Sequence, residues 1–157
     1  MPTRIGVIDV DRVVMDSAQG KAAFKHLQQL QKEKFTELKK MEDALAALEK
    51  KLSDQKFVLS DEKMADLNRQ YQDKKIAYKR FKDDSERDLN TARKEALKKL
   101  ERKIMPVIDQ VGREGNFALV FNKFNSGLVF AADAVDITDQ VLTRFDTQVN
   151  VPPPPAK

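Results

Sequence analysis

Few side chains in this sequence are suited to acid–base, nucleophilic or metal chemistry. The chain of 157 residues has one histidine, His26, and no cysteine. The missing cysteines exclude thiolate catalysis, zinc–thiolate sites and disulfides. A catalytic or metal-binding histidine needs partners that His26 does not have, so we expect it to be an ordinary surface residue.

Carboxylates are densest between residues 83 and 88. This cluster consists of Asp83, Asp84, Glu86 and Asp88. A calcium loop places its oxygen ligands on a turn that contains glycine, whereas this cluster winds around a predicted helix with basic residues interleaved. The sequence also lacks a phosphate-binding loop, a dinucleotide fingerprint and a nucleophile elbow. It therefore predicts a protein that is not an enzyme and that binds no cofactor and no metal.

The N-terminal residues predict a short strand followed by two helices. Residues 4–10, RIGVIDV, are rich in β-branched side chains, which is typical of a strand. Asp11 is then expected to cap a short helix. Ser17 is expected to cap a longer helix, whose periodic pattern is established from Lys21 onwards.

The C-terminal residues predict a β-hairpin and a last helix. Gly112 and Gly115 are expected to end the long helix before them. The apolar runs 117–121 and 128–131 flank a polar turn, which is typical of a β-hairpin. Asp136 is then expected to cap an amphipathic helix.

The middle of the chain has a heptad spacing of apolar residues, which is typical of a coiled-coil seam. In the first segment, these residues are Phe24, Leu27, Phe35, Leu38, Met41, Leu45, Leu48 and Leu52. In the second segment, they are Met64, Leu67, Tyr71, Tyr78, Phe81, Leu89, Ala96, Leu100, Ile104, Ile108 and Val111. Ser60 is expected to cap the second helix, and Pro106 is a candidate kink within it. Two such helices joined by a short turn pair as an antiparallel hairpin.

The predicted fold is therefore α+β and mostly α, with a long antiparallel helical hairpin on a small β-containing base. The coiled-coil arm is expected over residues 21–111 with its tip near 53–61, the base over 3–20 and 112–146, and a disordered Pro-rich tail over 147–157. A base of 53 residues without disulfides or metal is marginally stable by itself. Its strand edges are open to pairing with other copies, so we expect oligomerisation through the base.

The positive charge of the protein is concentrated in the predicted arm. Residues 21–111 contain 23 Lys and Arg against 17 Asp and Glu, whereas the rest of the chain contains 6 against 8. Such a surface attracts acidic partners: a negatively charged protein client, lipopolysaccharide or anionic lipid, or nucleic acid. The alternative is a solvated helix face with Glu–Lys pairs. The densest basic cluster consists of Lys74, Lys75, Lys79, Arg80 and Lys82.

Apolar residues outside the seam are candidates for contact with another protein. The predicted tip contains three consecutive ones, Phe57, Val58 and Leu59. Exposed apolar residues in a row are unfavourable unless something covers them, so they are either a contact for a bound protein or a plug that closes the turn. Tyr71, Tyr78 and Phe81 have seam spacing, but two helices cover only one side of each ring, so these aromatic residues are candidates for the same contact.

The two ends of the chain, together with the hairpin between them, resemble the Skp/OmpH family of periplasmic chaperones for outer-membrane proteins. The resemblance lies in the opening IGVIDVDRVVMDSAQGKAA and the closing FALVFNKFNSGLVFAADAVDITDQVL, and extends from about Arg4 to Phe145. It implies a homotrimer whose strands join in a shared β-body and whose three hairpins enclose a cavity for unfolded membrane proteins, without ATP. The residues then expected to support trimerisation are Ile5, Val7, Phe117, Leu119, Phe121, Val129, Ile137 and Val141.

The resemblance also implies a periplasmic location. The first residues of the chain do not have the pattern of a secretory signal, so we expect a leader to have been removed, and a cytosolic location is the alternative. Two other functions stay open: a basic coiled coil that binds nucleic acid or anionic lipid, and a structural spacer. The 17 acidic residues of the predicted arm argue against nucleic acid, and a spacer has no need of an apolar tip.

Overall fold

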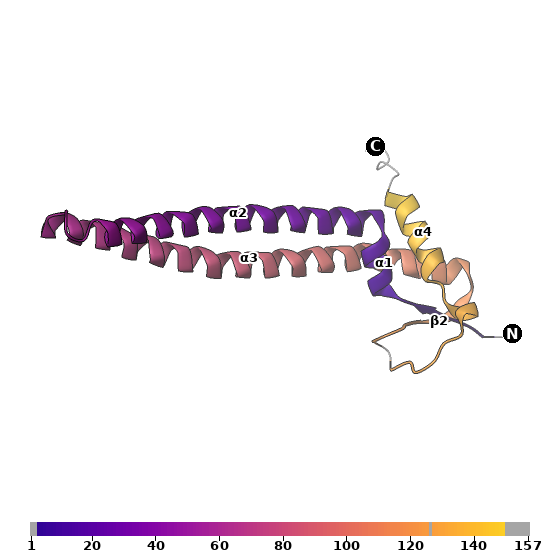
Figure 1. The fold of residues 1–157 in the computed structure, drawn as a ribbon. Helices are drawn as coiled ribbons and strands as arrows, with labels where there is room; N and C mark the ends of the chain where they lie inside the picture. The colour runs from indigo at the N-terminus through magenta and orange to yellow at the C-terminus, as the bar shows by residue number, and fades with distance from the viewer. Residues whose placement is uncertain (1–2, 126, 150–157) are drawn as a thin grey trace, which may run out of the picture. The chain divides into compact units, whose positions relative to one another are not determined.

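The computed structural model describes residues 3–125 and 127–149 of the protein, and the predicted disorder of residues 150–157 lies outside this part. The elements in chain order are β1 (Arg4–Ile8), α1 (Val10–Asp16), α2 (Ala18–Asp54), α3 (Asp61–Glu114), β2 (Phe117–Asn122), the 3-10 helix η1 (Asp133–Val135) and α4 (Thr138–Val149) (Figure 1). The described residues form two compact units, which we call the core unit (the described residues within 1–26 and 94–157) and the hairpin unit (residues 27–93). The predicted fold class, α+β and mostly α with a long helical hairpin, is confirmed.

The sheet of the core unit has two parallel strands. Val7 of β1 lies opposite Phe121 of β2, and Gly6 lies opposite Val120. The predicted β-hairpin is therefore wrong, because β2 pairs with β1 and residues 128–131 form no strand. The prediction depended on two apolar runs that lie close together in the chain. Parallel strands are joined by a long crossover, so the pairing of β1 with β2 leaves no such local signal. The other side of β1 forms a single bridge to Asp136.

One apolar core holds the core unit together. Its buried residues come from β1, α1, the last part of α3, the residue directly before α4, and α4 itself: Ile8, Val13, Val14, Leu100, Ile104, Val107, Val111, Ile137, Val141 and Phe145. Burial of this kind is the main favourable contribution to folding. The core therefore depends on segments from both ends of the chain.

The helix starts differ from the prediction at α1. Asp9 is the N-cap, and its Oδ1 accepts a hydrogen bond of 2.9 Å from the backbone N–H of Arg12, whereas Asp11 lies in the first turn. Either aspartate suits a helix start by residue type, and the end of β1 at Ile8 decides between them. The caps predicted for the long helices are confirmed: Ser17 Oγ accepts from the N–H of Gly20 at 3.0 Å, and Ser60 Oγ accepts from the N–H of Lys63 at 3.4 Å.

The helix ends also differ from the prediction. Helix α3 runs through Pro106 and through Gly112 and ends at Glu114, so Gly112 does not end it. The left-handed conformation after the helix is taken by Asn116, with φ 52°, a residue type that tolerates it. Helix α4 continues to Val149, so the expectation that the tail begins at residue 147 is wrong.

The hairpin unit consists of the facing parts of α2 and α3, which run antiparallel side by side (Figure 1). The prediction that Phe35 lies in the seam is wrong, because its side chain is 69% exposed. Lys34 takes this position, and its Nζ lies 2.9 Å from Asp88 Oδ2 of α3. The reason is the helical period: Leu27, Lys34 and Met41 are seven residues apart, which keeps them on one face.

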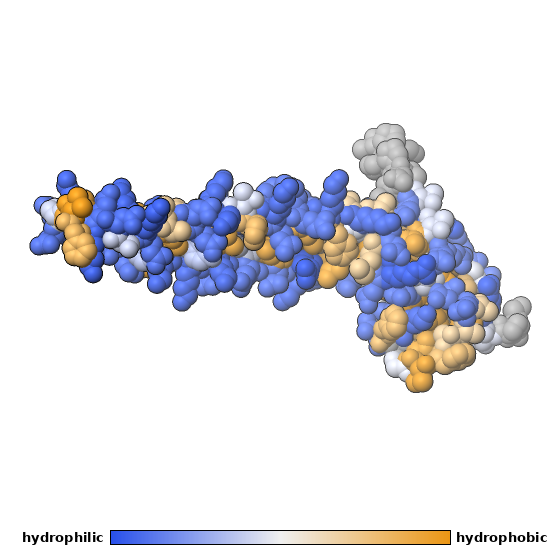
Figure 2. All heavy atoms as spheres, viewed as in Figure 1, coloured by the Kyte–Doolittle hydropathy of each residue, from blue (hydrophilic) through white to orange (hydrophobic). Residues whose placement is uncertain are grey.

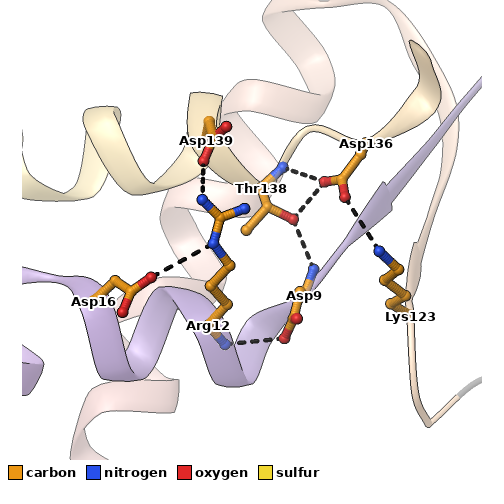
Figure 3. A network of polar contacts seen from close by, with 7 residues as sticks. All are labelled: Asp9, Arg12, Asp16, Lys123, Asp136, Thr138 and Asp139. Atoms are coloured by element: carbon orange, nitrogen blue, oxygen red, sulfur yellow. Dashed lines mark hydrogen bonds and ion pairs between the residues drawn. The ribbon is translucent and has the colours of Figure 1, made fainter. Parts of the chain in front are cut away.

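A polar network ties α1 and α4 to β1 (Figure 3). The Thr138 hydroxyl donates to Asp136 Oδ1 and accepts from the N–H of Asp9 at 2.9 Å. Arg12 donates to Asp139 at 2.6 Å, which links α1 to the start of α4. Burial by itself would raise the pKa of Asp136, but the hydrogen bonds from Thr138 and the nearby Lys123 ammonium outweigh it and lower that pKa. The ionised carboxylate therefore stabilises the start of α4.

Candidate functional site

The turn between α2 and α3 presents apolar side chains to solvent. The carbonyl of Gln55 accepts hydrogen bonds from the N–H groups of Val58, at 3.0 Å, and Leu59, at 3.1 Å. This tight turn leaves Phe57 94% and Val58 82% exposed, while Leu59 is half-buried. Figure 2 shows the resulting apolar surface at the end of the hairpin. A plug could therefore involve Leu59, but Phe57 and Val58 do not cover the turn.

Two further apolar side chains of the hairpin unit are exposed, and the sequence interpretation missed both. Phe35 lies on α2 outside the seam, and Ile76 lies on α3 with half of its surface exposed. A strict count of seven from Leu27 would have excluded Phe35 from the seam. With Phe57 and Val58, these residues make up what we call the exposed apolar set of the hairpin.

The aromatic residues predicted for the seam of α3 are each half-buried. Tyr71, Tyr78 and Phe81 all have an intermediate exposure. The Nζ of Lys75 lies 6.0 Å from the centre of the Tyr71 ring, and that of Lys34 lies 5.4 Å from the centre of the Phe81 ring. These are distances at which an ammonium group is attracted to an aromatic face. The rings thus stabilise the hairpin, and their part in binding another protein stays a prediction.

The predicted basic cluster forms a band on α3. Residues 69–82 contain six Lys and Arg and one acidic residue, Asp73. All five predicted members, Lys74, Lys75, Lys79, Arg80 and Lys82, are exposed. In the part of the chain that the structure describes, none of them forms an ion pair, whereas Arg87 in the next turns pairs with Asp84 at 2.9 Å. The band is therefore available to attract an acidic partner.

The residues proposed for trimerisation fall into two groups. Val7, Ile137 and Val141 are buried in the core of a single chain, and Phe117 and Phe121 are half-buried. Ile5, Leu119 and Val129 are exposed, Val129 to 99%. The first group therefore supports the fold of each chain, and the second is available for contact with another copy.

Exposed apolar surface continues beyond β2. Phe124 and Phe130, which the sequence interpretation did not single out, are exposed together with Val129. Figure 2 shows this surface over β2 and the segment that follows it. Residues 127–131 pair with no strand of the described chain, although their composition is typical of one.

Comparison with known families decides the classification of the chain. The family model described as outer membrane protein (OmpH-like) matches residues 4–145. The chain belongs to the OmpH-like family. The fold is similar to that of a candidate OmpH-like outer membrane chaperone from Caulobacter crescentus, with a TM-score of 0.87 and 20% sequence identity over 97% of this chain and 89% of that chain. A search among curated proteins found no match.

The remaining candidate residues of this OmpH-like protein gather into no metal site within the described ranges. His26 is exposed, and no group of three or more His, Cys, Asp or Glu side chains among the described residues could hold a metal ion. The acidic cluster at 83–88 is instead engaged in ion pairs, of Asp84 with Arg87 and of Asp88 with Lys34. Among the described helices, none has a stretch long and apolar enough to cross a lipid bilayer.

Proposed function

We propose that this OmpH-like protein is a periplasmic chaperone that holds unfolded outer-membrane proteins and needs no nucleotide. The observation that carries the proposal is the exposed apolar set of the hairpin, above all Phe57 and Val58. Exposed apolar side chains at a turn are unfavourable for a protein without a partner. An unfolded membrane protein offers apolar segments that would cover them.

The basic band is the second element of the proposed binding surface. An array of unpaired lysine and arginine side chains attracts acidic segments over about 10 Å at moderate salt. Weak electrostatic and apolar contacts spread over several copies of the hairpin would add up to useful affinity, and each contact alone would release readily. Lipopolysaccharide or anionic lipid is a further candidate partner for the same band.

A single hairpin encloses no cavity, so the proposal includes assembly into a homotrimer through the core unit. Support comes from the exposed apolar surface of Leu119, Phe124, Val129 and Phe130. The extended segment 127–131 is suited to pair with a strand of another copy, because an unpaired strand edge is a template for such pairing.

We expect the double variant Val129→Ser, Phe130→Ser to lose the oligomer. Both side chains are exposed and neither belongs to the core formed by the described residues, so the variant should keep its helical circular dichroism. Light scattering should give about three chains for the wild type at micromolar concentration and a smaller mass for the variant. The variant Met15→Ser, which also removes an exposed apolar side chain, is the control and should keep the wild-type mass. A wild-type monomer, or an unchanged mass in the double variant, would contradict this assembly.

We expect the double variant Phe57→Ser, Val58→Ser to bind an unfolded outer-membrane β-barrel protein at least about fivefold more weakly. The reason is the loss of two apolar side chains in each of several hairpins, each contributing on the order of 1 kcal/mol when covered. Suppression of aggregation without nucleotide measures the effect, with Met15→Ser again as the control. Unchanged holding by the tip variant would place the binding surface elsewhere. Tighter binding of duplex DNA than of the client would instead favour the nucleic-acid function.

A further inference from the structure

The seam of the hairpin unit contains a polar layer. Lys34 of α2 occupies a seam position and pairs with Asp88 of α3 at 2.9 Å. One turn before Asp88, Ser85 occupies a seam position of α3 and is only 2% exposed. The Phe81 ring lies one turn further towards the hairpin turn, with the Lys34 ammonium 5.4 Å from its centre. We call Lys34, Ser85 and Asp88 the polar layer.

The polar layer weakens the pairing of the two helices. The Ser85 hydroxyl is buried and has no hydrogen-bond partner among the described residues, so its lost contact with water is not compensated. The Lys34 side chain is partly buried and, among the described residues, has one ion-pair partner, Asp88. A polar residue at a seam position reduces the stability of a coiled coil relative to an apolar one.

The seam residues between the polar layer and the turn are only partly buried. They are half-buried apart from Leu67, which is buried: Leu38, Met41, Leu45, Leu48 and Leu52 on α2, and Met64, Leu67, Tyr71 and Tyr78 on α3. In the core unit, by contrast, Ile104, Val111 and Val141 have no exposed surface. Parts of a protein with few buried contacts open at a lower free energy than its core.

We propose that the polar layer is an opening point, beyond which the two helices separate up to the turn while the core unit stays folded. An apolar layer at this position would make the seam towards the turn and the seam towards the core unit open and close together. The polar layer interrupts this cooperativity. In the open form, the side chains of the seam are accessible to a partner in addition to the exposed apolar set. This inference does not depend on the proposed chaperone function.

Hydrogen exchange of the full-length protein, followed by mass spectrometry, tests the proposal. In the wild type, amides of residues 38–52 and 64–82 should exchange together and faster than those of residues 97–111. The double variant Lys34→Met, Ser85→Ala makes the two seam positions of the layer apolar at nearly constant length and volume, and it leaves the Asp88 carboxylate, whose side chain is 57% exposed, in contact with water. Its amides between the layer and the turn should exchange about tenfold more slowly, because the variant removes the buried hydroxyl that has no partner among the described residues and places an apolar side chain in the seam. Exchange at residues 97–111 should not change.

Two further variants keep the test decisive. Asp88→Asn removes the charge that neutralises Lys34 and should speed exchange in the same residues. Lys39→Met is the matched control, because Lys39 lies on the same helix and pairs with Asp43 at 3.0 Å, but outside the seam; it should leave the exchange unchanged. The proposal is overturned if the wild-type hairpin exchanges no faster than residues 97–111. It is equally overturned if the double variant exchanges like the wild type or like Lys39→Met.

Discussion

Replacement of Gly20 by alanine is expected to destabilise the protein by about 4 kcal/mol or more, a loss typical of a buried side chain forced against backbone. A Cβ atom at this position would lie 1.6 Å from the carbonyl oxygen of Val14 and 2.8 Å from its carbonyl carbon. Gly20 is buried, and its N–H donates to Ser17 Oγ at 3.0 Å. Because backbone atoms of α1 cause the clash, relief requires α1 to move, and that would disturb the buried Val13 and Val14.

Thermal unfolding followed by circular dichroism measures this loss, at one fixed protomer concentration because oligomers gain stability with concentration. Gly112→Ala is the matched control. Its Cβ would meet nothing closer than a Val120 side-chain atom at 3.9 Å, and the residue lies inside α3. Alanine is preferred to glycine in a helix, so this variant should be as stable as the wild type or more stable by up to about 1 kcal/mol. A wild-type melting temperature for Gly20→Ala would show that the junction of α1 and α2 is not as tight as described.

Phe145→Ala is expected to cost about 3–5 kcal/mol, the usual range for removing a buried aromatic side chain. Phe145 of α4 is 1% exposed and belongs to the core that β1, α1 and α3 also form. The cavity would lie where the two ends of the chain meet, so the whole core unit should lose stability. Urea unfolding measures the effect as a lower midpoint with an unchanged slope.

Phe35→Ala is the control for this variant, because it removes the same side chain from an exposed position on α2. Its effect on the free energy of unfolding should stay within about 0.5 kcal/mol, as for most surface substitutions. Equal losses for the two variants would mean that α4 does not contribute to the core as the structure indicates.

The long helices were predictable because their signals are local and repeated. Ser17 and Ser60 are good caps wherever a helix follows them, and a spacing of three and four residues places apolar side chains on one face. The turn near residues 53–61 and the apolar tip follow from the interruption of that spacing. The candidate contacts Phe57 and Val58 were therefore found from the sequence, whereas Phe35, predicted for the seam, is exposed, and the neighbouring Lys34 takes the seam position.

The sequence by itself determined the helical hairpin, its caps and the uneven distribution of charge, since each depends on residues close together in the chain. Only the tertiary structure decided that β2 pairs in parallel with β1, with Val7 opposite Phe121 across more than a hundred residues. It also decided that Lys34 pairs with Asp88 of the other helix and that the buried Ser85 hydroxyl has no partner among the described residues. The physical reason is the same in both cases: the partners of a strand or of a polar side chain depend on which distant segments the fold brings together, and local spacing carries no information about those partners.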